Sequence, residues 1–128
     1  MEKRFSIVNN DVEKYIVNTL APLDDELSII HENALKEGIP VVRLETLRVL
    51  ETYLAIKKPD SILELGCAIG FTSIFFSRYL SEKGFIDTVE NDISMVNRAK
   101  YNIKMKSLDK KINIIYAEAM DYLINIDR

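Results

Sequence analysis

Residues 61–72 read SILELGCAIGFT, and this stretch decides the fold. Its first five residues are mostly apolar and follow a Pro-Asp pair, which is typical of a parallel strand covered on both faces. Gly66 and Gly70 permit backbone conformations that a Cβ would forbid, and the apolar run after Gly70 opens a helix whose amide groups face the turn. We therefore predict that a nucleotide-type cofactor binds at this first strand-to-helix turn.

The residues around these glycines narrow the class of cofactor. A dinucleotide fingerprint needs a further glycine so that the backbone can approach a pyrophosphate, and Ala68 stands at that position. A P-loop needs a lysine after its last glycine, whereas an aromatic residue follows Gly70. An adenosine cofactor without phosphates tolerates Ala68 but needs an acceptor for its ribose hydroxyls. Glu90 supplies a carboxylate at the end of a predicted strand, at about the spacing expected of a ribose-binding acid.

Three motifs together resemble a known family. They are residues 64–72, the strand that ends in Glu90, and the stretch INIIYAEA at 112–119. In order and spacing they are similar to the S-adenosylmethionine (SAM) site of class I methyltransferases, and more narrowly to that of the catechol and caffeoyl-CoA type O-methyltransferases. The bacterial members of that family include a tRNA 5-hydroxyuridine methyltransferase. In the family the domain continues well beyond the point that corresponds to Arg128, so the resemblance implies an N-terminal portion only.

The alternation of strands and helices predicts an α/β fold with a parallel sheet. We expect a truncated, Rossmann-like class I methyltransferase fold, with strands in the order 3-2-1, flanking helices, and N-terminal helices before them. The predicted strands are 61–65, 85–90 and 111–116, the later helices are 71–80, 94–106 and a short one through 120–126, and the N-terminal helices run from 10 to about 20, from 24 to about 37 and from 43 to 57.

The chain divides into two parts. We expect residues 1–42 to form an N-terminal helical lead-in and a cofactor-covering segment, with residues 1–9 loosely held. We expect residues 43–128 to form the first, SAM-binding half of a methyltransferase domain. His31 is the single histidine and has no second ligand type at metal spacing nearby, so we interpret it as a helix-surface residue rather than a base or a ligand.

Composition limits the setting of the protein. At 128 residues and 48% hydrophobic content, one domain is expected. The net charge of −3 does not indicate overall electrostatic attraction to nucleic acid or anionic lipid. The single cysteine excludes an internal disulfide, and no apolar run approaches the ~20 residues that span a bilayer. We expect a cytoplasmic protein with no membrane partner.

The resemblance implies a set of cofactor-binding residues, and neither a catalytic residue nor a metal ligand within this chain. Val42 would cover the methionine end of SAM, Glu90 would hold both ribose hydroxyls, and the Ala119 N–H would read the adenine edge. The full set is Val42, Glu64, Gly66, Cys67, Ala68, Gly70, Thr72, Glu90, Asn91, Glu118 and Ala119.

Some of these residues also have an ordinary structural interpretation. Val42 would be an apolar connector, and Thr72 would be a helix cap instead of a donor to the cofactor carboxylate. Glu64 would accept from the amides of the turn, or approach the cofactor ammonium through water. We interpret Cys67 as a small pocket-lining residue rather than a nucleophile, because no histidine lies near it in the motif. Arg43 would contact the cofactor or remain a solvated charge.

The expected function is that of the cofactor-binding half of a SAM-dependent O-methyltransferase. The methyl acceptor would be a hydroxyl of a catechol-like small molecule or of a modified tRNA uridine. By the resemblance, a divalent metal (Mg or Mn) and the acceptor site belong to the full-length protein, so this chain would be inactive alone. An unpaired first strand also predicts a homo-oligomer. Two alternatives stay open: a non-catalytic SAM-binding module, and a nucleotide-binding protein or oxidoreductase.

Overall fold

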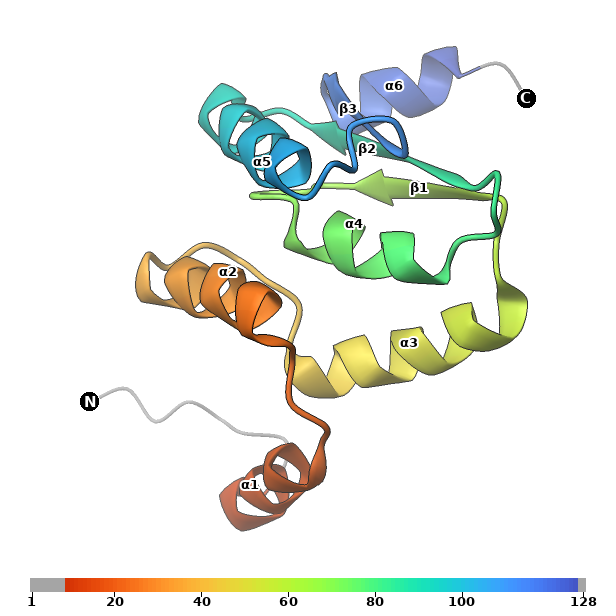
Figure 1. Cartoon of the computed structure of the whole chain (residues 1–128). Helices are drawn as coiled ribbons and strands as arrows, with labels where there is room; N and C mark the ends of the chain where they lie inside the picture. Colours follow the sequence, from red (N-terminus) through yellow and green to blue (C-terminus); the bar gives the residue numbers. More distant parts are fainter. Residues whose placement is uncertain (1–8, 127–128) are drawn as a thin grey trace.

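The protein is described by a computed structural model covering residues 9–126, and the remaining residues, including most of the expected loose lead-in, lie outside this range. Three N-terminal helices precede a three-stranded sheet with helices packed beside it (Figure 1). The elements are α1 (Asn10–Thr19), α2 (Asp25–Lys36), α3 (Leu44–Lys57), β1 (Ser61–Leu65), α4 (Phe71–Phe76), the 3₁₀ helix η1 (Ser77–Tyr79), β2 (Phe85–Glu90), α5 (Ile93–Met105), β3 (Ile112–Tyr116) and α6 (Ala119–Asn125).

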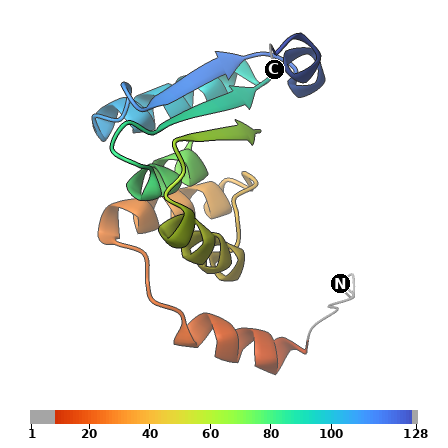
Figure 2. The same cartoon turned by 90° about the vertical axis from the view of Figure 1, so that its right-hand side faces the viewer.

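The sheet is parallel, and its order β1-β2-β3 confirms the predicted order 3-2-1. Leu63 pairs with Asp87, which pairs in turn with Asn113. Figure 2 shows the three strands side by side and pointing the same way. Their carboxyl ends therefore share one edge of the sheet, which is where an open α/β sheet binds its ligand.

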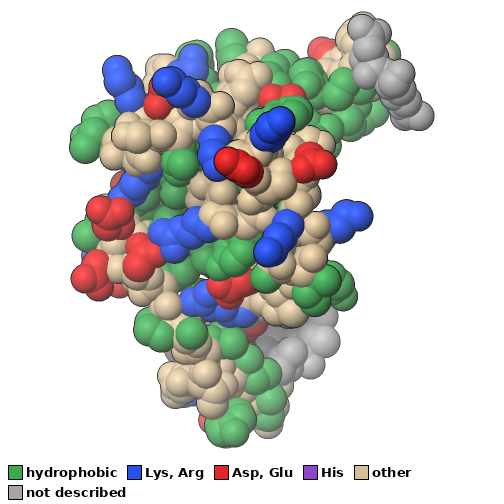
Figure 3. Space-filling model, turned by 45° about the vertical axis from the view of Figure 1, so that its right-hand side comes forward, with side chains coloured by type: hydrophobic (Ala, Val, Ile, Leu, Met, Phe, Trp, Pro, Cys, Tyr) green, Lys and Arg blue, Asp and Glu red, His purple; other side chains and the backbone are tan. Residues whose placement is uncertain are grey.

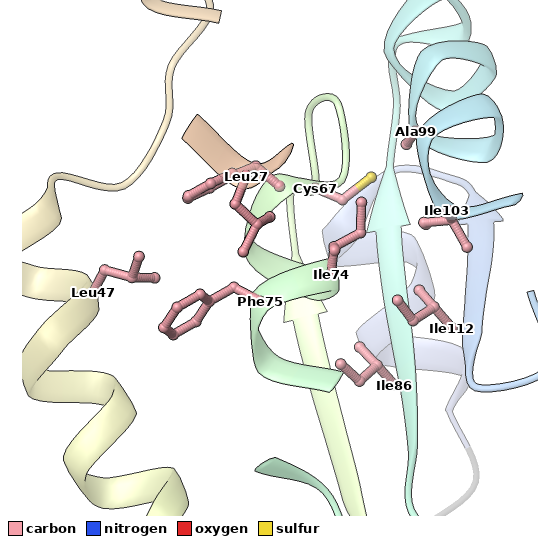
Figure 4. Packing of buried hydrophobic residues seen from close by; sticks show 10 residues of the cluster. Leu27, Leu47, Cys67, Ile74, Phe75, Ile86, Ala99, Ile103 and Ile112 are labelled. Carbon is pink, nitrogen blue, oxygen red and sulfur yellow. The ribbon is translucent and has the colours of Figure 1, made fainter. Parts of the chain in front are cut away.

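The hydrophobic core lies on one face of this sheet. Because side chains alternate along a strand, Ile86 and Ile112 point to the same face, and they pack there with Ile74 of α4 and Ile103 of α5. Figure 4 shows these side chains between the sheet and the two helices, whereas Phe75 points from α4 toward Leu47 of α3. Burial of such side chains, at about 1.5–3 kcal/mol each, is the main force that holds the layers together.

The opposite face of β1 is open, so the prediction of a strand covered on both faces was wrong. Leu63 and Leu65 are 43% and 47% exposed. The reason is that α4 and α5 both pack on the other face, whereas the short α6 contacts β2. Val89 of β2 is accordingly buried, at 1% exposure.

The N-terminal helices join the core unequally. Leu27 of α2 and Leu47 of α3 are fully buried in the core, and the side chain of Asp24 caps α2 by accepting from the Leu27 N–H. Helix α1 has no buried residue, and it packs mainly on α3. Its cap is Asn9, whose side chain accepts from the Asp11 N–H. None of the helices within residues 9–126 is long and apolar enough to cross a membrane.

The helix after the glycine turn is shorter than the predicted 71–80. Helix α4 ends at Phe76 and tightens into η1. The Ser77 hydroxyl donates to the Ile74 carbonyl, and such a local bond competes with regular helix hydrogen bonding. Leu80 is then extended, which returns the chain to the start of β2.

Candidate cofactor-binding site

Backbone hydrogen bonds bring the three strand ends together. The Gly66 N–H donates to the Val89 carbonyl at 2.7 Å, and the Ala117 N–H donates to the Glu90 carbonyl at 3.1 Å. The turn after β1 and the turn after β3 are therefore both fixed to the end of β2. This arrangement places the site residues predicted on these turns, which exclude Val42, around one edge of the sheet.

The glycine turn uses three left-handed backbone conformations. Gly66 and Gly70 have φ of +86° and +83°, and Ala68 between them has φ of +45°. Gly70 also lies against α5, because a Cβ there would stand 3.3 Å from the Cβ of Ala99. The Asn102 side chain of α5 donates to the Ile69 carbonyl at 2.9 Å, so α5 holds the turn from a second point.

Glu90 is already bonded to the turn. One carboxylate oxygen accepts from the Ala68 N–H at 2.9 Å, and the other accepts from the N–H groups of Asn91 and Asp92, each at 3.0 Å. A carboxylate has about four lone-pair positions, so one further hydroxyl fits beside Ala68. If Glu90 accepted hydrogen bonds from both ribose hydroxyls, one of these N–H groups would have to lose its bond to the carboxylate.

The ends of β2 and β3 are also bridged by side chains. The Asn91 amide donates to the Glu118 carboxylate at 2.9 Å, and both residues are exposed. Glu118 precedes α6, and Ala119 is its first residue. The structure thus brings Glu118 and Ala119, expected at the adenine, next to Asn91, which directly follows the expected ribose acceptor Glu90.

Glu64 lies beneath the turn, and the prediction that it accepts from the turn amides was wrong. One oxygen of its carboxylate accepts from the hydroxyls of Ser73 and Thr88, both fully buried. Burial raises the pKa of Glu64, while the two hydroxyls act in the opposite direction. The carboxylate therefore links β1, β2 and the first turn of α4.

Cys67 is 5% exposed. Burial, with a smaller effect of the neighbouring Glu64 carboxylate, raises the pKa of its thiol to about 12. A thiol in this state is a poor nucleophile, so the geometry favours the lining role over a catalytic one.

Thr72 follows the turn in α4, and Val42 is linked to the start of α4 through His31. The cap position of α4 is Gly70 and not Thr72, so the helix-cap interpretation of Thr72 was wrong. Val42 is half-buried against the core, and its carbonyl lies 3.2 Å from Nε2 of His31. The prediction that His31 is a helix-surface residue was therefore wrong, because its half-buried ring also packs on Phe71.

Arg43 is exposed and pairs with carboxylates, which favours the interpretation as a solvated charge.

Four residues that support the site were missed by sequence reasoning: His31, Ser73, Thr88 and Asn102. Each is polar and at least partly buried, and Ser73 and Thr88 are fully buried. A buried polar side chain needs a hydrogen-bond partner, so polar residues at core-facing positions were the available signal.

Fold and site together define the class of protein, a Rossmann-like methyltransferase. The chain belongs to a particular family within that class: the sequence model of the protein-L-isoaspartate(D-aspartate) O-methyltransferase (PCMT) family matches residues 23–121. A catechol O-methyltransferase of Niastella koreensis is 27% identical over 114 residues, which are 88% of this chain and 52% of that protein. The chain thus spans about half the length of this relative.

Solved structures show the same fold. An O-methyltransferase from Bacillus cereus, in complex with SAH, matches with a TM-score of 0.77 and 25% identity, over 91% of this chain and 54% of that one. A methyltransferase from Geobacter sulfurreducens matches with a TM-score of 0.80 and 22% identity, over 91% of this chain and 61% of that one. The predicted O-methyltransferase resemblance is confirmed.

Proposed function

We propose that this chain binds S-adenosylmethionine across the carboxyl ends of β1, β2 and β3 and forms the methyl-donor half of an O-methyltransferase. The observation that carries the proposal is the Glu90 carboxylate, which stands at the end of β2 with the glycine turn bonded to it through Ala68. Carboxylates accept charge-assisted bonds from the vicinal hydroxyls of a ribose, whereas they repel phosphates. The SAH-bound Bacillus cereus O-methyltransferase gives independent support.

The other predicted residues take separate portions of the cofactor in this proposal. Gly66 and Gly70 allow close approach of the sulfonium end, and Glu64 and Cys67 support the turn from below. Thr72 bonds the cofactor carboxylate and Val42 covers the methionine end. Adenine lies beside Asn91, Glu118 and Ala119.

SAM supplies an activated methyl group when it is bound. Transfer of that methyl group is an in-line displacement, so the chain contributes by holding the donor in a fixed orientation. The resemblance implies Mg or Mn for a full-length family member. Within residues 9–126 no group of three or more His, Cys, Asp or Glu side chains is placed to hold a metal ion, so we assign no step to a metal here.

The acceptor that we favour is a small, catechol-like hydroxyl compound. The name of the Niastella koreensis relative supports it, and the family description names isoaspartate, so transfer to oxygen is common to both. A modified tRNA uridine has less support. On the face drawn in Figure 3, basic side chains are interspersed with acidic and hydrophobic ones, whereas binding to a phosphate backbone favours a continuous basic surface.

Calorimetric titration with S-adenosylhomocysteine tests the proposal. We expect micromolar binding by the wild type and a loss of about 1.5–3 kcal/mol, or roughly 10- to 150-fold, in Glu90→Ala. Asp87→Ala is the matched control, because Asp87 is on the same strand but bonds Asn113. Its affinity should stay within about twofold of the wild type, less than one ordinary hydrogen bond is worth.

The alternatives predict other results. A non-catalytic SAM-binding module would bind S-adenosylhomocysteine without methyl transfer, even when the acceptor half is supplied. Binding of NAD together with failure to bind S-adenosylhomocysteine would overturn the proposal in favour of an oxidoreductase.

We also propose that the chain self-associates through the open face of the sheet. Leu63, Leu65 and Phe85 are each more than 40% exposed on that face, and within the described residues β1 pairs with β2 alone. A second copy would cover these side chains and the open strand edge. Sedimentation velocity should show concentration-dependent association that Leu63→Lys abolishes. A wild-type monomer at all concentrations would contradict this.

A cytoplasmic location belongs to the same proposal. The single cysteine, Cys67, is free and buried, which fits a reducing compartment. Fractionation of the cells that make the protein tests this location, and recovery from the membrane or outside the cell would contradict it.

A further inference from the structure

The segment 39–43 joins α2 to α3, and α2 holds it at two points. The Ile39 N–H donates to the Ala34 carbonyl at 2.9 Å, and the Val42 carbonyl lies 3.2 Å from Nε2 of His31. His31 and Ala34 are three residues apart, so they lie on one face of the helix. We call residues 39–43 the covering segment.

The same imidazole also contacts the helix that follows the glycine turn. The ring centroids of His31 and Phe71 are 5.0 Å apart, with the planes inclined by 50°. Phe71 is 1% exposed and follows Gly70 directly, so its position depends on the turn. His31 thus lies between the covering segment and the start of α4.

The chemistry of this contact fixes the role of the ring. A carbonyl oxygen can only accept, so Nε2 carries the hydrogen that is donated to Val42. The Val42 side chain packs against the hydrophobic core, which leaves its backbone partly removed from water. Without the imidazole donor this carbonyl would lose its partner in a partly buried place, and α2 would hold the covering segment through the Ile39 N–H alone of these two bonds.

We infer that His31 is a positioning residue for cofactor binding, which acts by holding Val42 over the glycine turn. The inference rests on the proposed SAM site. A wall that is already in place reduces the ordering cost of binding the flexible methionine portion of the cofactor. The adenosine portion binds at the strand ends and does not depend on this wall. His31 therefore contributes selectively to the methionine end.

Two substitutions separate the hydrogen bond from the packing. His31→Phe keeps an aromatic ring against Phe71 and loses the donor, whereas His31→Gln keeps a side-chain N–H. The binding of S-adenosylhomocysteine and of adenosine is measured by calorimetry for each variant and the wild type. We expect His31→Phe to weaken S-adenosylhomocysteine binding by about fivefold to tenfold, the worth of one hydrogen bond. Adenosine binding should not change, and His31→Gln should restore most of the loss.

A merely structural role would weaken both ligands together, because general loosening of the fold affects the whole site. Equal weakening of both ligands, or unchanged S-adenosylhomocysteine binding in His31→Phe, would overturn the inference. A wild type that binds neither ligand would refute the proposed function as well, and so differs from failure of the inference alone. Amide hydrogen exchange then reports separately on the contact: His31→Phe should speed exchange in residues 39–43, and equal exchange would show that His31 does not hold the segment.

Discussion

Substitution of Gly70 by alanine should destabilise the fold through two separable effects. The first is backbone strain, because φ is +83° and the left-handed region costs a residue with a Cβ about 1–2 kcal/mol. The second is crowding: the new Cβ would stand 3.3 Å from the Cβ and 3.4 Å from the Cα of Ala99, and backbone atoms yield little. Overpacking of this kind costs about 1–3 kcal/mol. The expected total is about 2–5 kcal/mol, a large part of the stability of a small domain.

Two other glycines supply matched controls. Gly66 and Gly38 have φ of +86° and +69°, and a Cβ on either would meet no atom within 4 Å. Gly66→Ala and Gly38→Ala should therefore each cost about 1–2 kcal/mol, from strain alone. Urea unfolding followed by far-UV circular dichroism gives the free energy of unfolding of each variant. If Gly70→Ala lowers the free energy of unfolding no more than the controls do, crowding against α5 does not contribute. If the controls leave the free energy of unfolding unchanged, backbone strain does not contribute.

Two further predictions concern the buried groups beneath the turn. The folded-state pKa of Glu64 is raised above its ordinary value of 4.5, so its contribution to stability is present below that value and is lost as pH rises through the folded-state pKa. Glu64→Gln should therefore gain stability relative to the wild type as the pH rises above 4.5, and a difference independent of pH would contradict this. The Cys67 thiol, with its pKa near 12, should react with an aromatic disulfide reagent at pH 8 roughly a thousandfold more slowly in the folded chain than in urea. Equal rates in the two states would show that the thiol is accessible.

Much of the fold could be predicted because its signals are local. The bounds of β1 match the prediction, since a short apolar run between Asp60 and Gly66 carries its own start and stop. Asp24 and Asp92 cap α2 and α5 as short polar residues before apolar runs do. The position of Glu90 at the end of β2 followed from the same rules, together with the site that the strand ends would form.

The failures share a different cause. The helix predicted over 71–80 is α-helical only to Phe76 and continues as a 3₁₀ turn to Tyr79, where the Ser77 hydroxyl bonds the Ile74 carbonyl, and composition does not show which serine will bond the backbone in this way. Leu63 looked like a residue buried in a parallel strand, yet its burial depends on which elements pack on each face. His31 looked like a surface residue, yet its partner is Val42, eleven positions further along the chain.

The sequence by itself determined the strands, their parallel order and the glycine turn, because backbone conformation and the alternation of elements are set by neighbouring residues. Tertiary structure alone decided how the polar groups around that turn are bonded. Glu64 found hydroxyls on α4 and β2, and Glu90 found the N–H of Ala68, twenty-two positions before it. Hydrogen bonds act within about 3 Å, and residues so far apart in sequence come within that distance only when the sheet and its helices have packed.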